Sequence, residues 1–476
     1  MYEKERRLIE AFVGGRMSRR ELFAGLGKLG VGAVAARYLL NDAVTSAMAA
    51  DFDWMKHKGT HLKLLLNKHP YADAMIADIE AFKKLTGMDI SYDIFPEDVY
   101  FDKVTAALSS KSSQYDCLMT GAYQTWQYGP AGWLVDLNEY INSDNTSSGW
   151  DKKDILPNLL ASDSWSGKPG DALGGEGAKQ WCLPWAFEQY CISYNKRIFD
   201  SLKLTPPQHM EDLIEAAVKI TKSDNNAYGI GVRGSRSWAT IHPGFLSGYV
   251  SYGASDFVMK DGHLKAAMNS PEAKKFTELW VKMIQEAGPK NWATYTWYQV
   301  GNDLGAGASG MIYDADILGF FQNNGDTKEK GNIGFHDFIA NPEAKAPKSN
   351  VWIWSLAMSN FSKQKDAAWY FLQWATSKEH DLFGAIKGDM VDPARQSVWD
   401  NDDFKSRMGK NKGYLEQFEK TSPGAKIYFT PQPLFFNVTT DWAAALQRMV
   451  AKQVPVDEGL DQLADSINKQ MEQAGL

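Results

Sequence analysis

The sequence predicts an α/β fold built around a mainly parallel sheet, and two stretches of the chain carry that prediction. Residues 351–358 alternate bulky and β-branched side chains, which is the pattern of a buried strand, and apolar side chains then recur at helical spacing from Ala367 to Ala375. Residues 61–120 read in turn as strand, helix, strand, helix and strand. That order favours parallel strands joined by right-handed crossovers.

The elements between residues 61 and 120 have clear boundary signals. Pro70 opens the first helix and Gly87 ends it, while Pro96 opens the second. The three strands are expected at 61–67, 89–95 and 115–120. Ligands of such sheets bind beyond the carboxyl ends of the strands. Those ends carry His69, Tyr71, Glu97, Tyr123 and Trp126, of which Tyr71, Glu97 and Tyr123 are the candidate ligand residues.

Length and composition narrow the class of protein. The chain has 476 residues, enough for two or three domains with a large core. Its 51 Lys and Arg residues against 58 Asp and Glu residues give a formal net charge of −7, which argues against a nucleic-acid partner and against a polybasic membrane patch. The 17 tryptophans indicate either unusually aromatic cores or aromatic surfaces that face a ligand.

Residues 1–50 read as a signal peptide for export by the twin-arginine route. The segment Met17–Phe23, with Arg19 and Arg20, resembles the twin-arginine motif. The Gly-rich run after it is too short and too polar for a membrane anchor, which needs about 20 apolar residues. Ala47-Met48-Ala49 supplies a small-x-small cleavage site. A basic amphipathic helix that stays on the protein is the alternative. We therefore expect a periplasmic protein.

The cysteines do not form a disulfide framework, because Cys117, Cys182 and Cys191 are an odd number. Cys182 and Cys191 flank an expected loop and are able to pair, but buried free thiols are the favoured interpretation. No Cys or His spacing typical of a metal site occurs. The sequence predicts neither a metal nor a cofactor.

The strand at 351–358 and the helix after it, with the run AWYFLQWATSKEH, resemble a unit of the extracellular solute-binding proteins of carbohydrate ABC importers, the maltose-binding-protein-like family. AGWLVDLNEYI at 131–141 extends the similarity, which covers nearly the whole mature chain. The resemblance implies a periplasmic-binding-protein-like fold, with two α/β lobes, a central sheet in each, and a cleft between them. Crossings are expected near residues 136, 315 and 355. The first lobe would then comprise 51–136 plus 315–355, and the second 137–314 plus 356–476.

The resemblance also implies further ligand residues. Trp352 and Trp354 start the strand whose counterpart lines the sugar cleft. Trp185 and Glu188 follow Pro184, and Arg236 and Trp238 lie on the loop after residue 234. Asp316 lies at the crossing near 315, and Arg395 lies in the segment 388–395, which resembles a loop motif of the family. Within the segment 388–395, Asp389 and Val391 stand where the family usually has small residues or prolines.

Several of these candidates also suit structural roles. Trp185 could simply cover the edge of the sheet, and Arg236 and Trp238 could form a solvated cation–π pair at the surface. Asp314 and Asp316 could cap the helix that follows them, or they could accept hydrogen bonds from ligand hydroxyls.

A carbohydrate or polyol is the expected ligand, delivered by a monomeric binding protein to the membrane permease of an ABC transporter. Sugar C–H faces stack on indoles, and each contact removes apolar area from water at about 25 cal/mol per Å². Carboxylates, Arg and amides then pair with the hydroxyls, because a buried unpaired polar group costs roughly 1–3 kcal/mol. No catalytic residue is predicted.

Two other functions remain open from the sequence. A polyamine binder of the same architecture would use Glu97, Glu188, Asp314 and Asp316 to neutralise its ligand, and its affinity would fall in high salt. A secreted glycoside hydrolase would need a carboxylate pair about 5–9.5 Å apart in the cleft.

Overall fold

The computed structural model describes residues 8, 25, 28, 52–223 and 227–476. The twin-arginine motif and the expected cleavage site lie outside these residues. Within them, no helix is both long enough and apolar enough to cross a membrane. Eight strands form one continuous sheet in the order β2-β1-β3-β12-β6-β10-β7, with β11 also paired to β6.

The first half of the sheet contains the parallel unit that the sequence predicts. Strands β1 (His61–Asn67), β2 (Asp89–Phe95) and β3 (Cys117–Gly121) pair in parallel, with β1 in the middle. Strand β12 (Val351–Met358) then runs antiparallel to β3. These four strands confirm the predicted order of elements and the strand predicted at 351–358.

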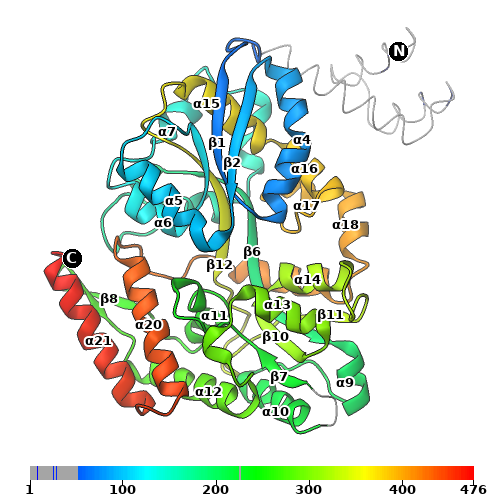
Figure 1. The fold of residues 1–476 in the computed structure, drawn as a ribbon, viewed down its shortest axis with the longest axis vertical. Coiled ribbons are helices and arrows are strands. Elements are labelled where there is room, and N and C mark those ends of the chain that lie inside the picture. The colour runs from blue at the N-terminus through cyan, green and yellow to red at the C-terminus, as the bar shows by residue number, and fades with distance from the viewer. Residues whose placement is uncertain (1–7, 9–24, 26–27, 29–51, 224–226) are drawn as a thin grey trace.

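A single long strand, β6 (Leu183–Asn195), connects the two halves of the sheet. Its first seven residues run beside β12, and its last six pair with β10 (Ser309–Ala315) and β11 (Ile333–His336). Strand β7 (Tyr228–Gly231) completes the second half by parallel pairing with β10. Every residue of β6 and β12 is buried. Figure 1 shows the result as two lobes stacked along the long axis, with β6 and β12 running between them.

Helices cover the strands of each lobe (Figure 1). Those of the first lobe are α4 (Pro70–Thr86), α5 (Glu97–Ser109), α6 (Ala122–Tyr128), α7 (Asn138–Ile141), α8 (Pro157–Ser162), α15 (Lys365–Ala375), α16 (Lys378–Lys387) and α17 (Gln396–Trp399). Those of the second lobe are α9 (Lys196–Leu202), α10 (Met210–Thr221), α11 (Gly244–Ser251), α12 (Pro271–Ala287), α13 (Trp297–Ala306), α14 (Asp316–Asn324), α19 (Tyr414–Thr421), α20 (Phe435–Val450) and α21 (Val456–Gln473). Helix α18 (Asp402–Met408) contacts α16, α17 and α19 and so links the lobes.

Short elements complete the described chain. Two hairpins pair β4 (Ser164–Trp165) with β5 (Lys179–Gln180) and β8 (Phe257–Lys260) with β9 (His263–Ala266). The 3-10 turns are η1 (Ser148–Trp150), η2 (Lys152–Asp154), η3 (Trp238–Thr240), η4 (Trp292–Thr294) and η5 (Ser422–Gly424).

The expected division into lobes needs correcting. Trp369 on α15 packs against Tyr140 and Trp150, and α15 itself contacts α4 and β12, so residues 137–150 and α15 lie with the first lobe. Helix α14, expected in the first lobe, packs instead against β6 and β11 of the second. The chain crosses along β6, at the start of β12 and through α18, so the crossing expected near residue 355 agrees with the structure, whereas those expected near 136 and 315 do not. The long strand β6 is the physical reason, because its halves pair with different partners.

The three cysteines are buried and free. Cys182 and Cys191 both lie in or next to β6, where they are held at separate positions along an extended strand. The favoured interpretation of buried thiols therefore agrees with the structure.

Candidate functional site

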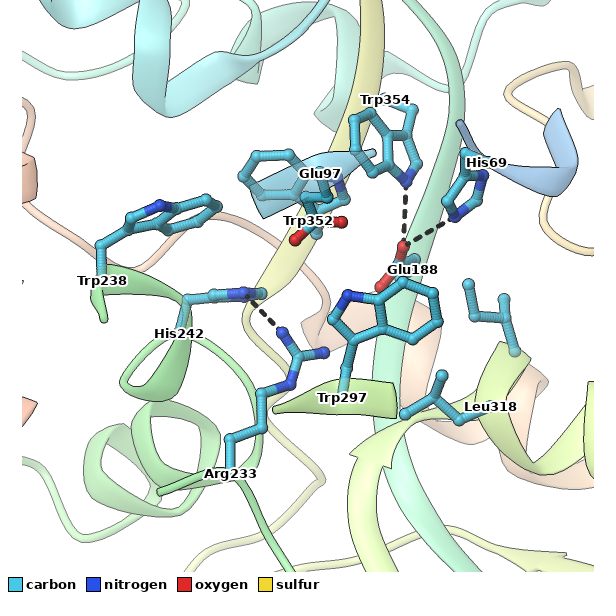
Figure 2. Close-up of a pocket in the computed structure, with 11 residues that line it drawn as sticks. His69, Glu97, Glu188, Arg233, Trp238, His242, Trp297, Leu318, Trp352 and Trp354 are labelled. Carbon is cyan, nitrogen blue, oxygen red and sulfur yellow. Dashed lines mark hydrogen bonds and ion pairs between the residues drawn. The ribbon is translucent and has the colours of Figure 1, made fainter. Parts of the chain in front are cut away.

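A pocket lies where the two lobes face each other across β6 and β12 (Figure 2). Its empty space, open mouth included, is about 350 Å³. Four tryptophans and several ionisable groups surround it. The lining residues are His69, Glu97, Glu188, Arg233, Trp238, His242, Trp297, Ile317, Leu318, Trp352 and Trp354. Both lobes and both connecting strands therefore contribute to one site.

Strand alternation positions the central indoles. Side chains two apart on a strand share a face, so Trp352 and Trp354 both lie on the pocket side of β12. Their ring centroids are 5.0 Å apart and their planes meet at 81°. Trp238, in η3 of the second lobe, lies 5.2 Å from Trp352. The three rings form an angular apolar wall of the kind that packs against C–H groups.

Glu188 lies at the centre of the pocket, on β6. The indole Nε1 of Trp354 donates to its Oε1 over 3.0 Å. Burial raises the pKa of Glu188 to about 8, although the positive charge of Arg233 opposes this shift. Near neutral pH the carboxyl is therefore mostly protonated, and it can donate a hydrogen bond as well as accept one.

His69 faces Glu188 from the first lobe (Figure 2). It precedes α4 as the N-cap residue, where its Nδ1 accepts the backbone N–H of Tyr71 over 3.2 Å. Burial lowers the pKa of His69 to about 3, so the ring is neutral and carries its proton on Nε2. That atom is 3.9 Å from Glu188 Oε1, which is too long for a hydrogen bond. The contact is therefore not an ion pair despite its proximity.

A fixed cation lies on the opposite side. Arg233 follows β7 and donates from Nε and Nη2 to the two oxygens of Asp314 on β10, over 2.9 and 2.7 Å. Its Nη1 is 3.2 Å from His242 Nε2, and His242 Nδ1 is 2.7 Å from the Tyr190 hydroxyl. Burial and the charge of Arg233 keep the pKa of His242 well below its usual value, so Nε2 accepts from the guanidinium. The charge of Arg233 is thus balanced within the protein.

The remaining lining residues come from helix starts. Glu97 begins α5, Trp297 begins α13, and Ile317 and Leu318 lie in the first turn of α14. Trp297 is half-buried and faces Glu188 from below in Figure 2. Among the described residues no hydrogen-bond partner reaches the buried Nε1 of Trp352. A donor left in this state favours an incoming oxygen.

The structure brings five of the sequence-predicted residues together at this pocket. They are Glu97, Glu188, Trp238, Trp352 and Trp354.

Three other predicted residues lie behind the pocket in the core, for reasons that their contacts give. The Tyr71 hydroxyl is 3.4 Å from the carbonyl of Phe187, and the Tyr123 hydroxyl donates to the carbonyl of Val351 over 2.8 Å. Both tyrosines thus support the connecting strands. Trp185 is 1% exposed and packs 6.3 Å from the Tyr71 ring, which matches its alternative role as a structural residue.

The last three predicted residues lie elsewhere. Arg236 is exposed and borders a separate surface hollow formed with α20 and α21. Arg395 is buried in the first lobe, where it donates to the carbonyls of Thr376 and Asp151. Asp316 is buried outside the pocket lining and accepts from Gln417 over 3.1 Å.

Six lining residues were not among the candidates chosen from the sequence, although the sequence places His69 at the carboxyl end of a predicted strand: His69, Arg233, His242, Trp297, Ile317 and Leu318. Two of them carried a usable signal. His69 directly precedes the proline that opens a helix at the carboxyl end of a predicted strand, and Arg233 ends a predicted strand three residues before the arginine that was chosen. Neither Trp297 nor Leu318 has a local pattern that separates it from a core residue.

In the described part of the chain, no three His, Cys, Asp or Glu side chains gather as metal ligands.

Comparisons with known proteins agree on one family. Residues 68–381 match the profile of the bacterial extracellular solute-binding proteins. The chain is 40% identical over 445 residues to the erythritol/L-threitol-binding protein of Mycolicibacterium smegmatis, an alignment that covers 91% of this chain and 92% of that relative. It is 22% identical over 397 residues to the mannitol-binding protein of Pseudomonas aeruginosa, covering 80% and 86% respectively.

Solved structures extend the agreement to the fold. The crystal structure of an ABC transporter solute-binding protein from Agrobacterium vitis, with bound D-mannitol, is similar with a TM-score of 0.72 and 25% identity, covering 88% of this chain and 99% of that one. A solute-binding protein from Agrobacterium radiobacter in complex with ribitol gives a TM-score of 0.74, covering 87% and 99%. The chain therefore belongs to the bacterial extracellular solute-binding protein family and has its two-lobed fold.

Proposed function

We propose that this protein is the substrate-binding component of an ABC importer and that it takes a small polyol into the pocket between its lobes. The observation that carries the proposal is the combination of four indoles with polar groups, among which Arg233 is paired with Asp314 and Glu188 is mostly protonated near neutral pH. Indoles bind C–H faces, and neutral donors and acceptors bind hydroxyls without the cost of an unbalanced buried charge. The relatives named for erythritol, L-threitol and mannitol support the same ligand class.

Size favours a short chain of carbons over an oligosaccharide. The pocket is small, since its empty space is only about 350 Å³ even with the open mouth included. Hydroxyls of the ligand would meet Glu188, His69 and Arg233 from different directions. The indole Nε1 of Trp352 would gain the partner that it lacks. A tetritol or pentitol satisfies both requirements.

The charges of the pocket make a polyamine a poor ligand. Arg233 already neutralises Asp314, and the raised pKa of Glu188 leaves that carboxyl mostly uncharged near neutral pH. Asp316 does not line the pocket. Of the four acids once considered for a polyamine, only Glu97 remains as a plausible partner, which is too little for a ligand with several positive charges.

Binding would close the lobes. Arg233, Trp238 and Trp297 come from the second lobe, whereas His69 and Glu97 come from the first. A ligand that touches both sets binds the closed form better and shifts the population toward it. The connecting segments would act as the hinge. We also propose that the protein binds without chemical change and works as a monomer.

A ligand screen tests this proposal. Thermal shift against tetritols, pentitols, hexitols, maltose and putrescine, followed by calorimetry, should give the largest stabilisation for a short polyol. A ligand at about 100 times its dissociation constant adds roughly 2.7 kcal/mol to the free energy of unfolding. Binding of putrescine alone, weakened by salt, would overturn the proposal in favour of a polyamine binder.

Export by the twin-arginine route is part of the same proposal. The motif with Arg19 and Arg20 is an address read by a receptor, so the charge alone should not suffice. Replacing both arginines by lysine should leave the precursor in the cytoplasm, as measured by fractionation. Unchanged export of the double variant would show that another route is used.

A further inference from the structure

A second group of buried acids lies next to the pocket but does not line it. Asp316, at the start of α14, and Asp392, in the loop after α16, are both 0% exposed. Asp316 belongs to the second lobe, where α14 packs on β6 and β11. Asp392 belongs to the first, because its carbonyl accepts the N–H of Phe187 over 3.0 Å in the part of β6 that runs beside β12. The two carboxyls therefore meet across the boundary between the lobes.

The hydrogen bonds of this pair account for only half of its oxygens. The Tyr414 hydroxyl donates to Asp392 Oδ1 over 2.5 Å, and Gln417 Nε2 donates to Asp316 Oδ2 over 3.1 Å. Among the described residues no donor reaches Asp316 Oδ1 or Asp392 Oδ2. Tyr414 and Gln417 lie one turn apart on α19, so the two carboxyls that they hold lie close together in the same buried space. Two carboxylates cannot pair unless one of them carries a proton.

We propose that Asp316 and Asp392 share one proton and thereby act as a pH-sensitive clasp that holds the two lobes in the closed arrangement. The clasp rests on the lobe closure proposed above and adds a form of control to it. It is continuous with the binding site, because Ile317 follows Asp316 and Glu188 follows Phe187, and both of these neighbours line the pocket. Opening would expose both carboxyls to water and release the proton.

The direction of the pH effect follows from burial. Burial raises the pKa of Asp316 to about 6 and raises the pKa of Asp392 well above its usual value, with each carboxyl adding to the cost of ionising the other. In the open form both would return toward the ordinary value of about 3.9. A proton held more tightly by the closed form favours closure at acidic pH. The preference is lost as pH rises from about 4 to above 6.

Other ionisable groups face the pair, and all of them except Glu188 keep one charge state in this range. They are Tyr71 on α4, Glu188 and Cys191 on β6, and Tyr414 on α19; Arg407 on α18 acts on the two tyrosines. Burial raises the pKa values of the tyrosines and the thiol, so these groups stay neutral. Arg407 stays positive through this range, as arginines do. Glu188 is the one group that needs a control, because its pKa is about 8.

The test compares the unliganded wild type with Asp392→Asn and Asp316→Asn between about pH 5 and about pH 8. An amide keeps the shape of the carboxyl and donates a hydrogen bond at every pH. By solution scattering, the wild type should expand as pH rises, whereas each variant should keep its radius of gyration. Infrared difference spectra should show a protonated carboxyl in the wild type that is missing from each variant.

Asp381→Asn is the matched control. Asp381 is another buried acid whose pKa burial raises, to about 8, but it accepts from the backbone N–H of Arg395 within the first lobe. The Asp381→Asn protein should lose one protonated-carboxyl signal from its infrared spectrum, but it should still expand as pH rises. Repeating the scattering with Glu188→Gln should leave the expansion in place. Polyol affinity of the wild type should fall by up to tenfold per pH unit within the window, for one linked proton.

Three results would overturn the clasp. The first is a radius of gyration of the unliganded wild type that does not change with pH. The second is an expansion that persists in both Asn variants. The third is a protonated-carboxyl signal that neither variant removes. If neither variant folds, the wild-type scattering titration decides alone, since only compaction at acidic pH supports the clasp. Failure of polyol to compact the protein at one fixed pH would count instead against the proposed function.

Discussion

Two tryptophans on neighbouring strands show how this fold separates a ligand wall from a core. Trp354 on β12 pairs with Ala186 on β6, and Trp185 is the residue next to that partner. Both side chains are almost completely buried, at 2% and 1% exposed. Only Trp354 lines the pocket, where its indole donates to Glu188. Trp185 packs beside Tyr71, and no hydrogen-bond partner reaches its Nε1 among the described residues.

The difference lies in strand register, because the pairing of β6 with β12 passes from Ala186 to Pro184 and skips Trp185, whose ring is not part of the pocket lining. Burial does not distinguish the two residues, and neither does their type. A tryptophan at the lobe boundary therefore becomes a candidate ligand residue only when its register is known. Substitutions at the two positions should separate stability from affinity.

The largest effect should follow from Trp185→Ala. Removing a large core side chain leaves a cavity and costs about 3–5 kcal/mol of unfolding free energy. The polyol affinity of the folded fraction should stay near the wild-type value, because Trp185 does not line the pocket. Denaturant unfolding and calorimetry measure the two quantities. A loss of affinity with stability intact would move Trp185 into the site.

Trp354→Ala should differ by losing polyol affinity as well as stability, because Trp354 is as deeply buried as Trp185 but also lines the pocket. The ligand would lose an apolar wall, and Glu188 would lose its indole donor, so the binding free energy should fall by about 1–3 kcal/mol. Trp354→Phe is the matched control, since it keeps a ring but removes the N–H, and it should lose less affinity. Calorimetry with a short polyol checks both variants. Wild-type affinity in Trp354→Ala would make this indole a core residue like Trp185.

The two tryptophans also indicate which parts of the site a sequence can predict. Strand alternation correctly predicted the parallel strands of the first lobe and the strand at 351–358, and Trp352 and Trp354 at its start line the pocket. The sequence could not show that Trp185 stays out of the pocket, because β6 and β12 change register between Trp354 and Ser355 and the pairing skips Trp185. That irregularity is not visible in the alternation of either strand.

Charged residues were harder to place for a different reason. The choice of Arg236 over Arg233 rested on a loop near a tryptophan, whereas the structure selects Arg233 because Asp314 lies opposite on β10. Pairings between distant segments leave no local pattern in the chain. The same holds for the lobe boundaries, which depend on the partners of β6 rather than on any break in composition.

Glu188→Gln sharpens the comparison through pH. The pKa of Glu188 is about 8 in the folded protein and about 4.3 in an unfolded chain, so the folded protein prefers the protonated acid. The wild type should therefore lose stability as pH rises between these values, by at most about 1.4 kcal/mol per pH unit. The uncharged variant should lose less. Melting curves across this range test the difference, and parallel profiles for the two proteins would contradict the raised pKa.

The smallest effect is expected for Arg236→Ala. Arg236 is exposed and lies outside the pocket, so both stability and polyol affinity should change by no more than about 0.5 kcal/mol. Thermal shift with and without ligand measures both. A clear loss of affinity would mean that the loop after β7 moves into the cleft when ligand binds.

Solution scattering with a saturating polyol tests most directly whether the ligand is held between the lobes. The lining residues come from both lobes, so the bound form should be more compact than the free form. The radius of gyration should shrink in proportion to the occupancy measured by calorimetry on the same sample. If the curves with and without tightly bound polyol superimpose at full occupancy, ligand does not close the lobes and the account is wrong.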